Sequence, residues 1–235
     1  THFRSPINTM CFVPVARLPE IFGKIAANGF SSFIIDIAMG VLTMLFNRQI
    51  MRCLGSDALA VYAVIVNIST FVQCCAYGVG QAAQPIISQN YGAGRSDRVS
   101  QLLRYCLISC AVIGAAWTAA VIALPNGFIK LFMSPTAAVL AIAPEIMRIY
   151  AVSFLLLPYN VFSTYYFQAM LRPGTSVVIS VSRGIVISGA LIMLLPLLLG
   201  SNSVWWAMPI AEAATAIYVT ASTVKVQKAF QKSEC

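Results

Sequence analysis

An acidic residue inside a long apolar stretch is the first candidate for chemistry in this sequence. Asp36 lies within the apolar segment 29–53. A carboxylate at the centre of a membrane-spanning helix costs roughly 2.5–3.5 kcal/mol on insertion scales, so Asp36 is expected to face protein or water. We predict that Asp36 binds a proton or a cation such as Na+, with a structural hydrogen bond to a neighbouring helix as the alternative. At helical spacing its face also carries Ser32, Gly40, Thr43 and Asn47.

A second polar feature is a stripe along the apolar segment 58–87. Polar residues recur there every three or four positions, which places them on one helical face. The stripe either hydrogen-bonds to neighbouring helices or forms the wall of a water-filled cavity, and the sequence leaves both readings open. In the segment 146–171, Asn160, Thr164 and Gln168 repeat the pattern at four-residue spacing. The stripe consists of Asn67, Thr70, Cys74, Tyr77, Gln81 and Gln84.

Two further charged residues fall in or near apolar segments. Glu212 is a second acid within a predicted span, and we assign it a structural polar contact. Arg183 lies near the start of another predicted span. A long basic side chain there is expected to extend to the cytoplasmic interface.

The elements that must position these residues are transmembrane helices. The chain has 235 residues, of which 59% are hydrophobic and 9% charged, with a mean hydropathy of +0.83. A soluble domain carries nearer 25% charge, and in lipid only helices or closed barrels satisfy the backbone. The apolar runs are long and do not alternate, which favours helices. We predict an all-α polytopic membrane protein with a six-helix transmembrane bundle, its spans at residues 29–53, 58–87, 102–124, 146–171, 177–199 and 204–224.

The net charge of +8 reflects membrane topology and not nucleic-acid binding. When alternate loops are placed on opposite sides of the bilayer, most of the fifteen basic residues fall on one side, and such an excess marks the cytoplasm. Both termini are therefore expected to be cytoplasmic, in the inner or plasma membrane of the cell. Residues 1–28 are predicted to form a cytoplasmic segment, residues 29–228 the transmembrane lobe and residues 229–235 a cytoplasmic tail.

The sequence argues against an enzyme. Its single histidine is His2, so a Ser/His or Cys/His nucleophile system is nearly excluded. No glycine-rich nucleotide motif and no cysteine spacing typical of a zinc site occurs. We expect no cofactor and no metal site beyond Na+ at Asp36.

Several segments together resemble the multidrug and toxic compound extrusion (MATE) family. Residues 78–95 (GVGQAAQPIISQNYGAGR) resemble the end of its eighth helix and the following loop. Residues 167–170 (FQAM) resemble the end of the tenth helix, 180–183 (SVSR) part of the eleventh and 204–212 (VWWAMPIAE) the start of the twelfth. The segments occur in the family's order and cover nearly all of residues 20–228.

The resemblance implies a fold, a function and a limit. The fold is twelve helices in two six-helix lobes around a central cavity. The function is H+- or Na+-coupled antiport of amphipathic cationic drugs out of the cell. The limit is that the match covers the C-terminal lobe only, with residues 1–28 as the segment between lobes. The chain would then need the N-terminal lobe or a second copy of itself as a partner.

Carried over residue by residue, the resemblance places Asp36 at the seventh-helix acid of the family's cation site. Asn160 stands where one branch has a partner Asp in the tenth helix. An Asn can ligate a cation through its oxygen, but it carries neither charge nor proton. The residues we expect to bind cation or substrate are Asp36, Asn160, Tyr77, Gln81, Asn67 and Thr43.

Two alternatives to a drug exporter remain. One is a truncated, non-transporting membrane fragment or an assembly subunit. The other is a flippase of lipid-linked sugars from the same superfamily. A flippase needs several Arg or Lys in its cavity to hold a pyrophosphate, and the predicted spans offer almost none away from their ends.

Overall fold

The computed structural model of the chain describes residue 22 and residues 40–232, and every element in residues 40–232 is helical. Three short helices lie between the longer ones: the α-helix α4, the π-helix η2 and the 3-10 helix η3. The elements are a helix at residues 40–54, α2 (Ser56–Gly92), α3 (Ser96–Ala123), α4 (Pro125–Phe132), α5 (Ala137–Ala169), α6 (Pro173–Val181), η2 (Ser182–Ile187), α7 (Ser188–Leu199), η3 (Ser201–Trp206) and α8 (Ala207–Lys232).

The prediction of an all-α membrane bundle is confirmed. Among the described residues, four helices are long and apolar enough to cross a membrane: α2, α3, α5 and the rod formed by α6, η2 and α7. Helix α8 is 26 residues long, but Glu212, Lys225 and Lys228 lower its hydropathy. The first predicted span begins before residue 40, so part of it lies outside the described residues, as do residues 233–235 of the predicted tail.

The helices are longer than the hydropathy of the sequence predicts. Helix α2 has 37 residues against the predicted 58–87, and it is about 55 Å long at 1.5 Å per residue. Helix α5 begins at Ala137 and not near residue 146. Hydropathy detects only the part of a helix that lies in lipid, about 30 Å, so the polar extensions beyond it are missed.

The helix boundaries follow the turn residues of the sequence. Gly55 (φ 85°) and Gly200 (φ 88°) adopt the left-handed backbone conformation that favours glycine. Pro173 occupies the first turn of α6, where its missing N–H costs no hydrogen bond. Thr136 caps α5 by accepting a hydrogen bond from the Val139 N–H (3.3 Å). Helix α3 ends at Ala123, and Pro125 begins the short helix α4.

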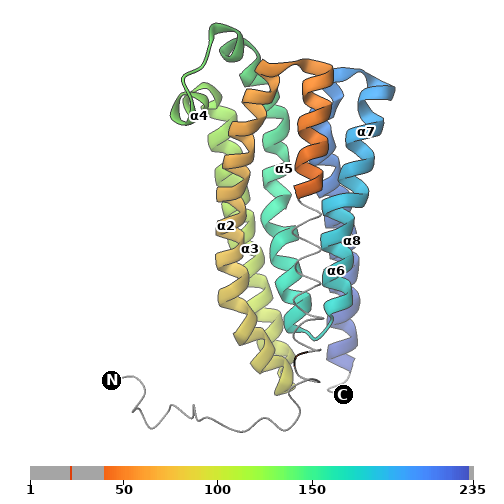
Figure 1. Cartoon of the computed structure of the whole chain (residues 1–235). Coiled ribbons are helices and arrows are strands. Elements are labelled where there is room, and N and C mark those ends of the chain that lie inside the picture. The colour runs from red at the N-terminus through yellow and green to blue at the C-terminus, as the bar shows by residue number, and fades with distance from the viewer. Residues whose placement is uncertain (1–21, 23–39, 233–235) are drawn as a thin grey trace. The chain divides into compact units, whose positions relative to one another are not determined.

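Helix α5 is the centre of the bundle, because it packs on α2, α3 and α8 (Figure 1). Its contact with α3 is close. A Cβ placed on Gly114 of α3 would lie 2.7 Å from the carbonyl oxygen of Leu155, so only glycine fits there. One helical turn further along α3, Thr118 donates a hydrogen bond to the carbonyl of Ala151 (3.2 Å). The central helix is thereby held at backbone distance from its neighbour.

Candidate functional site

Three polar side chains from three different helices meet in the interior of the bundle. Arg183 Nε donates a hydrogen bond to Glu212 Oε1 (2.7 Å), which makes a salt bridge. Asn160 Nδ2 lies 2.6 Å from Glu212 Oε2 and 2.9 Å from the Glu212 backbone carbonyl. Glu212 and Asn160 are fully buried, and 13% of the Arg183 side chain is accessible. We call Arg183, Glu212 and Asn160 the buried cluster.

The local backbone of each helix is irregular where it carries a member of the buried cluster. Arg183 lies in the π-helix η2, and its own carbonyl accepts a hydrogen bond from the Ser188 hydroxyl (2.5 Å). Asn160 follows Pro158 by two residues, and Glu212 follows Pro209 by three. A proline removes one backbone hydrogen bond, and π-turns are frequent at functional sites. The sequence thus places a proline or a π-turn close to each of the three polar side chains.

The charges of the buried cluster cancel, which is what a low-dielectric interior requires. A single buried charge carries a desolvation cost of several kcal/mol, and a hydrogen-bonded partner of opposite sign offsets that cost. Both carboxylate oxygens of Glu212 accept a hydrogen bond. By contrast, Asn160 Oδ1 is buried and accepts a hydrogen bond from no group of the described residues.

A cavity of about 240 Å³ adjoins the buried cluster. Arg183 belongs to both, because it pairs with Glu212 and also lines the cavity. The polar part of the lining comes from Thr43, Ser69, Thr70, Gln73 and Tyr150, and the apolar part from Leu42, Phe46, Val66, Leu157 and Met208, with Tyr62 completing the wall. The cavity therefore offers both polar and apolar contacts, which suits an amphipathic ligand.

The expectation that Arg183 extends to the cytoplasmic interface is wrong. Its guanidinium group instead pairs with Glu212 in the interior. Because both charges are already out of water, the Glu212 carboxylate stabilises the Arg183 cation more than partial exposure to solvent does. Arg183 is therefore not one of the basic residues that report membrane topology. Glu212 makes the structural polar contact expected of it, and its partners are Arg183 and Asn160.

The structure separates the predicted binding residues into three groups. Thr43 lines the cavity and Asn160 belongs to the buried cluster. Asn67, Tyr77 and Gln81 lie on an exposed face of α2 and line neither. Asp36 lies outside the described residues.

The α2 stripe is exposed along most of its length, and it makes hydrogen bonds within its own helix as well as one to a neighbouring helix. Asn67 Nδ2 donates to the Ala63 carbonyl of its own helix (3.0 Å). Tyr77 donates to Gln73 Oε1 (3.3 Å) and stacks edge-on against Tyr165 of α5. At the far end, Gln84 Nε2 reaches Gln168 Oε1 of α5 (3.5 Å).

Sequence periodicity missed Ser69, Gln73 and Tyr150 as cavity residues. Ser69 and Gln73 lie next to the stripe on α2 but off its face, and the Tyr150 hydroxyl faces the Ser69 hydroxyl from α5. A usable signal did exist for Arg183. An acid within a span requires a partner, and Arg183 is the basic residue in the neighbouring span.

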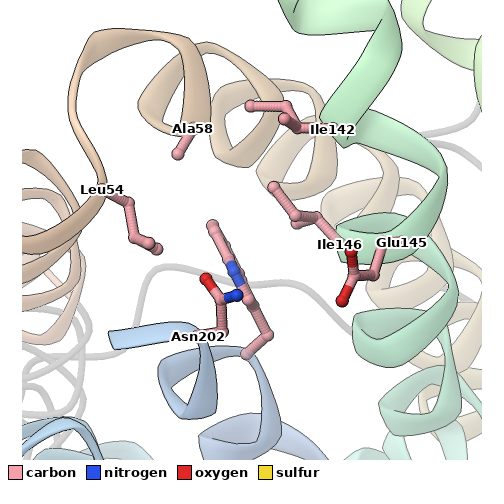
Figure 2. Close-up of a pocket in the computed structure, with 7 residues that line it drawn as sticks. Leu54, Ala58, Ile142, Glu145, Ile146 and Asn202 are labelled. Atoms are coloured by element: carbon pink, nitrogen blue, oxygen red, sulfur yellow. The ribbon is translucent and has the colours of Figure 1, made fainter. Parts of the chain in front are cut away.

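A second, smaller cavity of about 150 Å³ lies at one end of the helices. Figure 2 shows Leu54 and Ala58 on one side of it and Ile142, Ile146 and Glu145 on the other. Asn202 and the buried Trp205 also line this cavity. Glu145 and Asn202 are both exposed. Because polar groups converge on the larger cavity from several helices, the larger cavity is the candidate site.

Membrane-length helices around a partly polar cavity define a class, the polytopic α-helical membrane proteins. The chain belongs to the MatE family, whose model matches residues 31–194. No curated protein matches the chain.

Solved structures of the same class share the fold. The chain resembles the outward-facing conformation of a multidrug resistance MATE family transporter of the MOP superfamily (TM-score 0.83, 19% identity), with 96% of this chain and 50% of the other covered. The inward-facing conformation of such a transporter gives a TM-score of 0.82 at 18% identity, covering 95% and 51%. A MOP superfamily transporter from Pyrococcus furiosus Vc1, described by the reverse polarity of its binding pocket, gives 0.82 at 17%, covering 94% and 49%.

The chain spans about half the length of these structures, which agrees with the resemblance to one lobe of a MATE transporter. At these identities the likeness establishes the fold, and the chemistry of the site has to come from the chain's own residues.

Proposed function

We propose that this chain is the C-terminal lobe of a cation-coupled exporter of amphipathic organic cations. The observation that carries the proposal is the cavity beside Arg183, which is lined by both polar and apolar side chains within a membrane bundle of the MatE family. An amphipathic molecule can place its apolar part against Phe46 and Met208 and its polar part toward Gln73. The proposed location is the plasma membrane, with both termini in the cytoplasm.

The proposed coupling residue is Asp36. The sequence pattern places it two helical turns before Thr43 on the same predicted face, and Thr43 lines the cavity. Asn160 cannot carry a proton, and Glu212 is already paired with Arg183. Asp36 is therefore the acid available for H+ or Na+ exchange.

The partner that completes the proposed transporter is an N-terminal lobe or a second copy of this chain. The support is that the chain covers half the length of the two-lobe structures it resembles. The exposed polar stripe of α2 supports the same proposal, because a stripe in contact with a second lobe or with water avoids the cost of polar groups in lipid.

Ethidium efflux from cells that produce the chain, alone or joined to an N-terminal MATE lobe, tests the proposal. We expect uncoupler- or Na+-sensitive efflux from the two-lobe protein and none from the chain alone. Asp36→Asn should reduce efflux by the two-lobe protein at least tenfold. The control Asp57→Asn alters an exposed acid at the start of α2 and should leave efflux unchanged.

Two results would count against the proposal. Normal efflux by the two-lobe Asp36→Asn protein would remove Asp36 from the mechanism. Absence of efflux from a two-lobe protein confirmed to be in the membrane would favour a non-transporting membrane subunit. A flippase is not favoured, because a pyrophosphate needs several basic residues and Arg183 is the single one among the described residues that line the cavity.

A further inference from the structure

Arg183 has hydrogen-bonding capacity that the fold does not use. A guanidinium group carries five N–H donors in a planar fork. The Nε–H bonds Glu212, while the two terminal amino groups have no hydrogen-bond partner among the described residues. Because Arg183 lines the cavity and is nearly buried, these donors are available to a ligand there and not to bulk water.

A second hydrogen-bond donor, the Gln73 amide, also lines the cavity. The Gln73 side chain uses its carbonyl oxygen to accept a hydrogen bond from Tyr77 (3.3 Å). This leaves its amide NH2 without a partner among the described residues. Arg183 comes from η2 and Gln73 from α2, and both line the cavity. Their donors together suit a planar group with two acceptor oxygens, which is a carboxylate.

The cavity lining also includes a hydrogen-bond acceptor, the Thr70 hydroxyl oxygen. The Thr70 hydroxyl donates its proton to the Val66 carbonyl of its own helix (2.9 Å). Its oxygen lone pairs are therefore directed to other groups as acceptors, and Thr70 lines the cavity. An ammonium or amine N–H of a ligand can use such an oxygen.

The described charges at the cavity wall are Arg183 and its partner Glu212, which form an ion pair. A zwitterion adds no net charge and uses both the unpaired donors and the acceptor.

We infer that the cavity binds amphipathic zwitterions, with the ligand carboxylate on Arg183 and Gln73. The inference rests on the proposed export function and deepens it, since the substrate keeps a cationic group and gains a required carboxylate. Arg183 is then a substrate-binding residue, and Glu212 is the positioning residue that holds the guanidinium group at the cavity wall.

A pair of dyes that differ only at the carboxyl group tests the inference. Rhodamine 110 is a zwitterion, and rhodamine 123 is its cationic methyl ester. Binding to the full 235-residue chain in lipid nanodiscs is measured by fluorescence anisotropy. We expect rhodamine 110 to bind about tenfold more tightly than rhodamine 123, the ratio of one charge-assisted hydrogen-bond pair.

Variants locate the carboxylate. The double variant Arg183→Gln/Glu212→Gln removes both charges of the pair, so no buried charge is left alone. The double variant should bind rhodamine 110 and rhodamine 123 with about equal affinity. The matched control Ser163→Ala removes a buried hydroxyl that bonds the Tyr159 carbonyl of its own helix, so the preference for rhodamine 110 should be kept.

A further variant covers the case in which the double variant does not fold, as judged by size-exclusion chromatography and circular dichroism. Gln73→Leu removes the second donor away from the ion pair and should lower the preference about threefold. Equal binding of the two dyes to the unaltered chain would overturn the inference and leave the proposed function standing. Binding of neither dye would count against both. A full preference retained by the folded double variant would show that the carboxylate binds elsewhere, which also overturns the inference.

Discussion

The two polar regions of this lobe are organised on different principles. The α2 stripe belongs to one helix, is largely exposed, and satisfies many of its groups within that helix, as Asn67 does with the Ala63 carbonyl. The buried cluster takes one residue from each of three helices. Asn160 and Glu212 are fully buried and Arg183 nearly so, and the charges of Arg183 and Glu212 cancel.

The difference shows which region holds the lobe together and which faces outward. Removing a stripe side chain exposes nothing that was buried, because its neighbours are already accessible. Removing one partner from the Arg183–Glu212 pair leaves a charge in the interior without compensation. The buried cluster is therefore expected to determine stability and cavity shape, and the stripe to determine what lies against the lobe.

The largest effect should come from breaking the ion pair. Glu212→Ala leaves Arg183 buried without its counter-charge, and we expect the free energy of unfolding to fall by about 3 kcal/mol or more. Thermal unfolding in nanodiscs, followed by tryptophan fluorescence, measures the loss. The double variant Arg183→Gln/Glu212→Gln is the control and should lose much less, because two neutral amides can still hydrogen-bond. Equal losses in the two proteins would mean that packing, and not charge, is what Glu212 supplies.

An intermediate effect should come from Asn160→Ala. Asn160 joins α5 to α8 through its two contacts with Glu212, so its loss leaves buried acceptors unsatisfied at a cost of about 1–3 kcal/mol. Ser163→Ala is a matched control on the same helix, because the buried Ser163 hydroxyl bonds only the Tyr159 carbonyl of its own helix among the described residues (2.7 Å). The same thermal measurement should rank Asn160→Ala as clearly the more damaging change. A larger loss from Ser163→Ala would contradict the role given to the buried cluster.

The sequence predicted the stripe and the helices well because both are periodic properties of one segment. Hydropathy found α2, α3, α5 and the α6–α7 rod, and Gly55 and Gly200 marked their ends through the backbone conformations that glycine favours. A polar residue every three or four positions shows the stripe directly. It does not show what covers the stripe, since that depends on other chains or on solvent.

The buried cluster was harder to predict because its members are far apart in the sequence. Asn160, Arg183 and Glu212 meet only after α5, η2 and α8 have packed, and no period links them. The direction of the Arg183 side chain was mispredicted because a position near the end of a span favours the interface. Arg183 lies in the π-turn at residues 182–187, which nothing in the local sequence predicted.

The smallest effect on stability should come from the stripe. Asn67→Ala and Gln81→Ala remove exposed side chains, so each should change the free energy of unfolding by less than about 0.5 kcal/mol. The same thermal measurement applies. A loss as large as that of Asn160→Ala would mean that the stripe is a packing surface of the lobe itself.

The native cysteines decide what the stripe faces. Cys74 lies on the stripe, and Cys75 is exposed about 100° away around the same helix, while Cys110 of α3 is buried. The test reagent is a charged, membrane-impermeant maleimide applied to intact proteoliposomes or nanodiscs, with labelling read by peptide mass spectrometry. If the stripe lines water, the reagent should modify Cys74. It should leave Cys75, which then faces lipid, and Cys110 in the core unmodified. Cys74→Ser should abolish the labelling of α2 and Cys75→Ser should not. If Cys75 is labelled as fast as Cys74, both faces of α2 are exposed to water. The proposed difference between a water-facing stripe and a lipid-facing side of α2 would then be wrong.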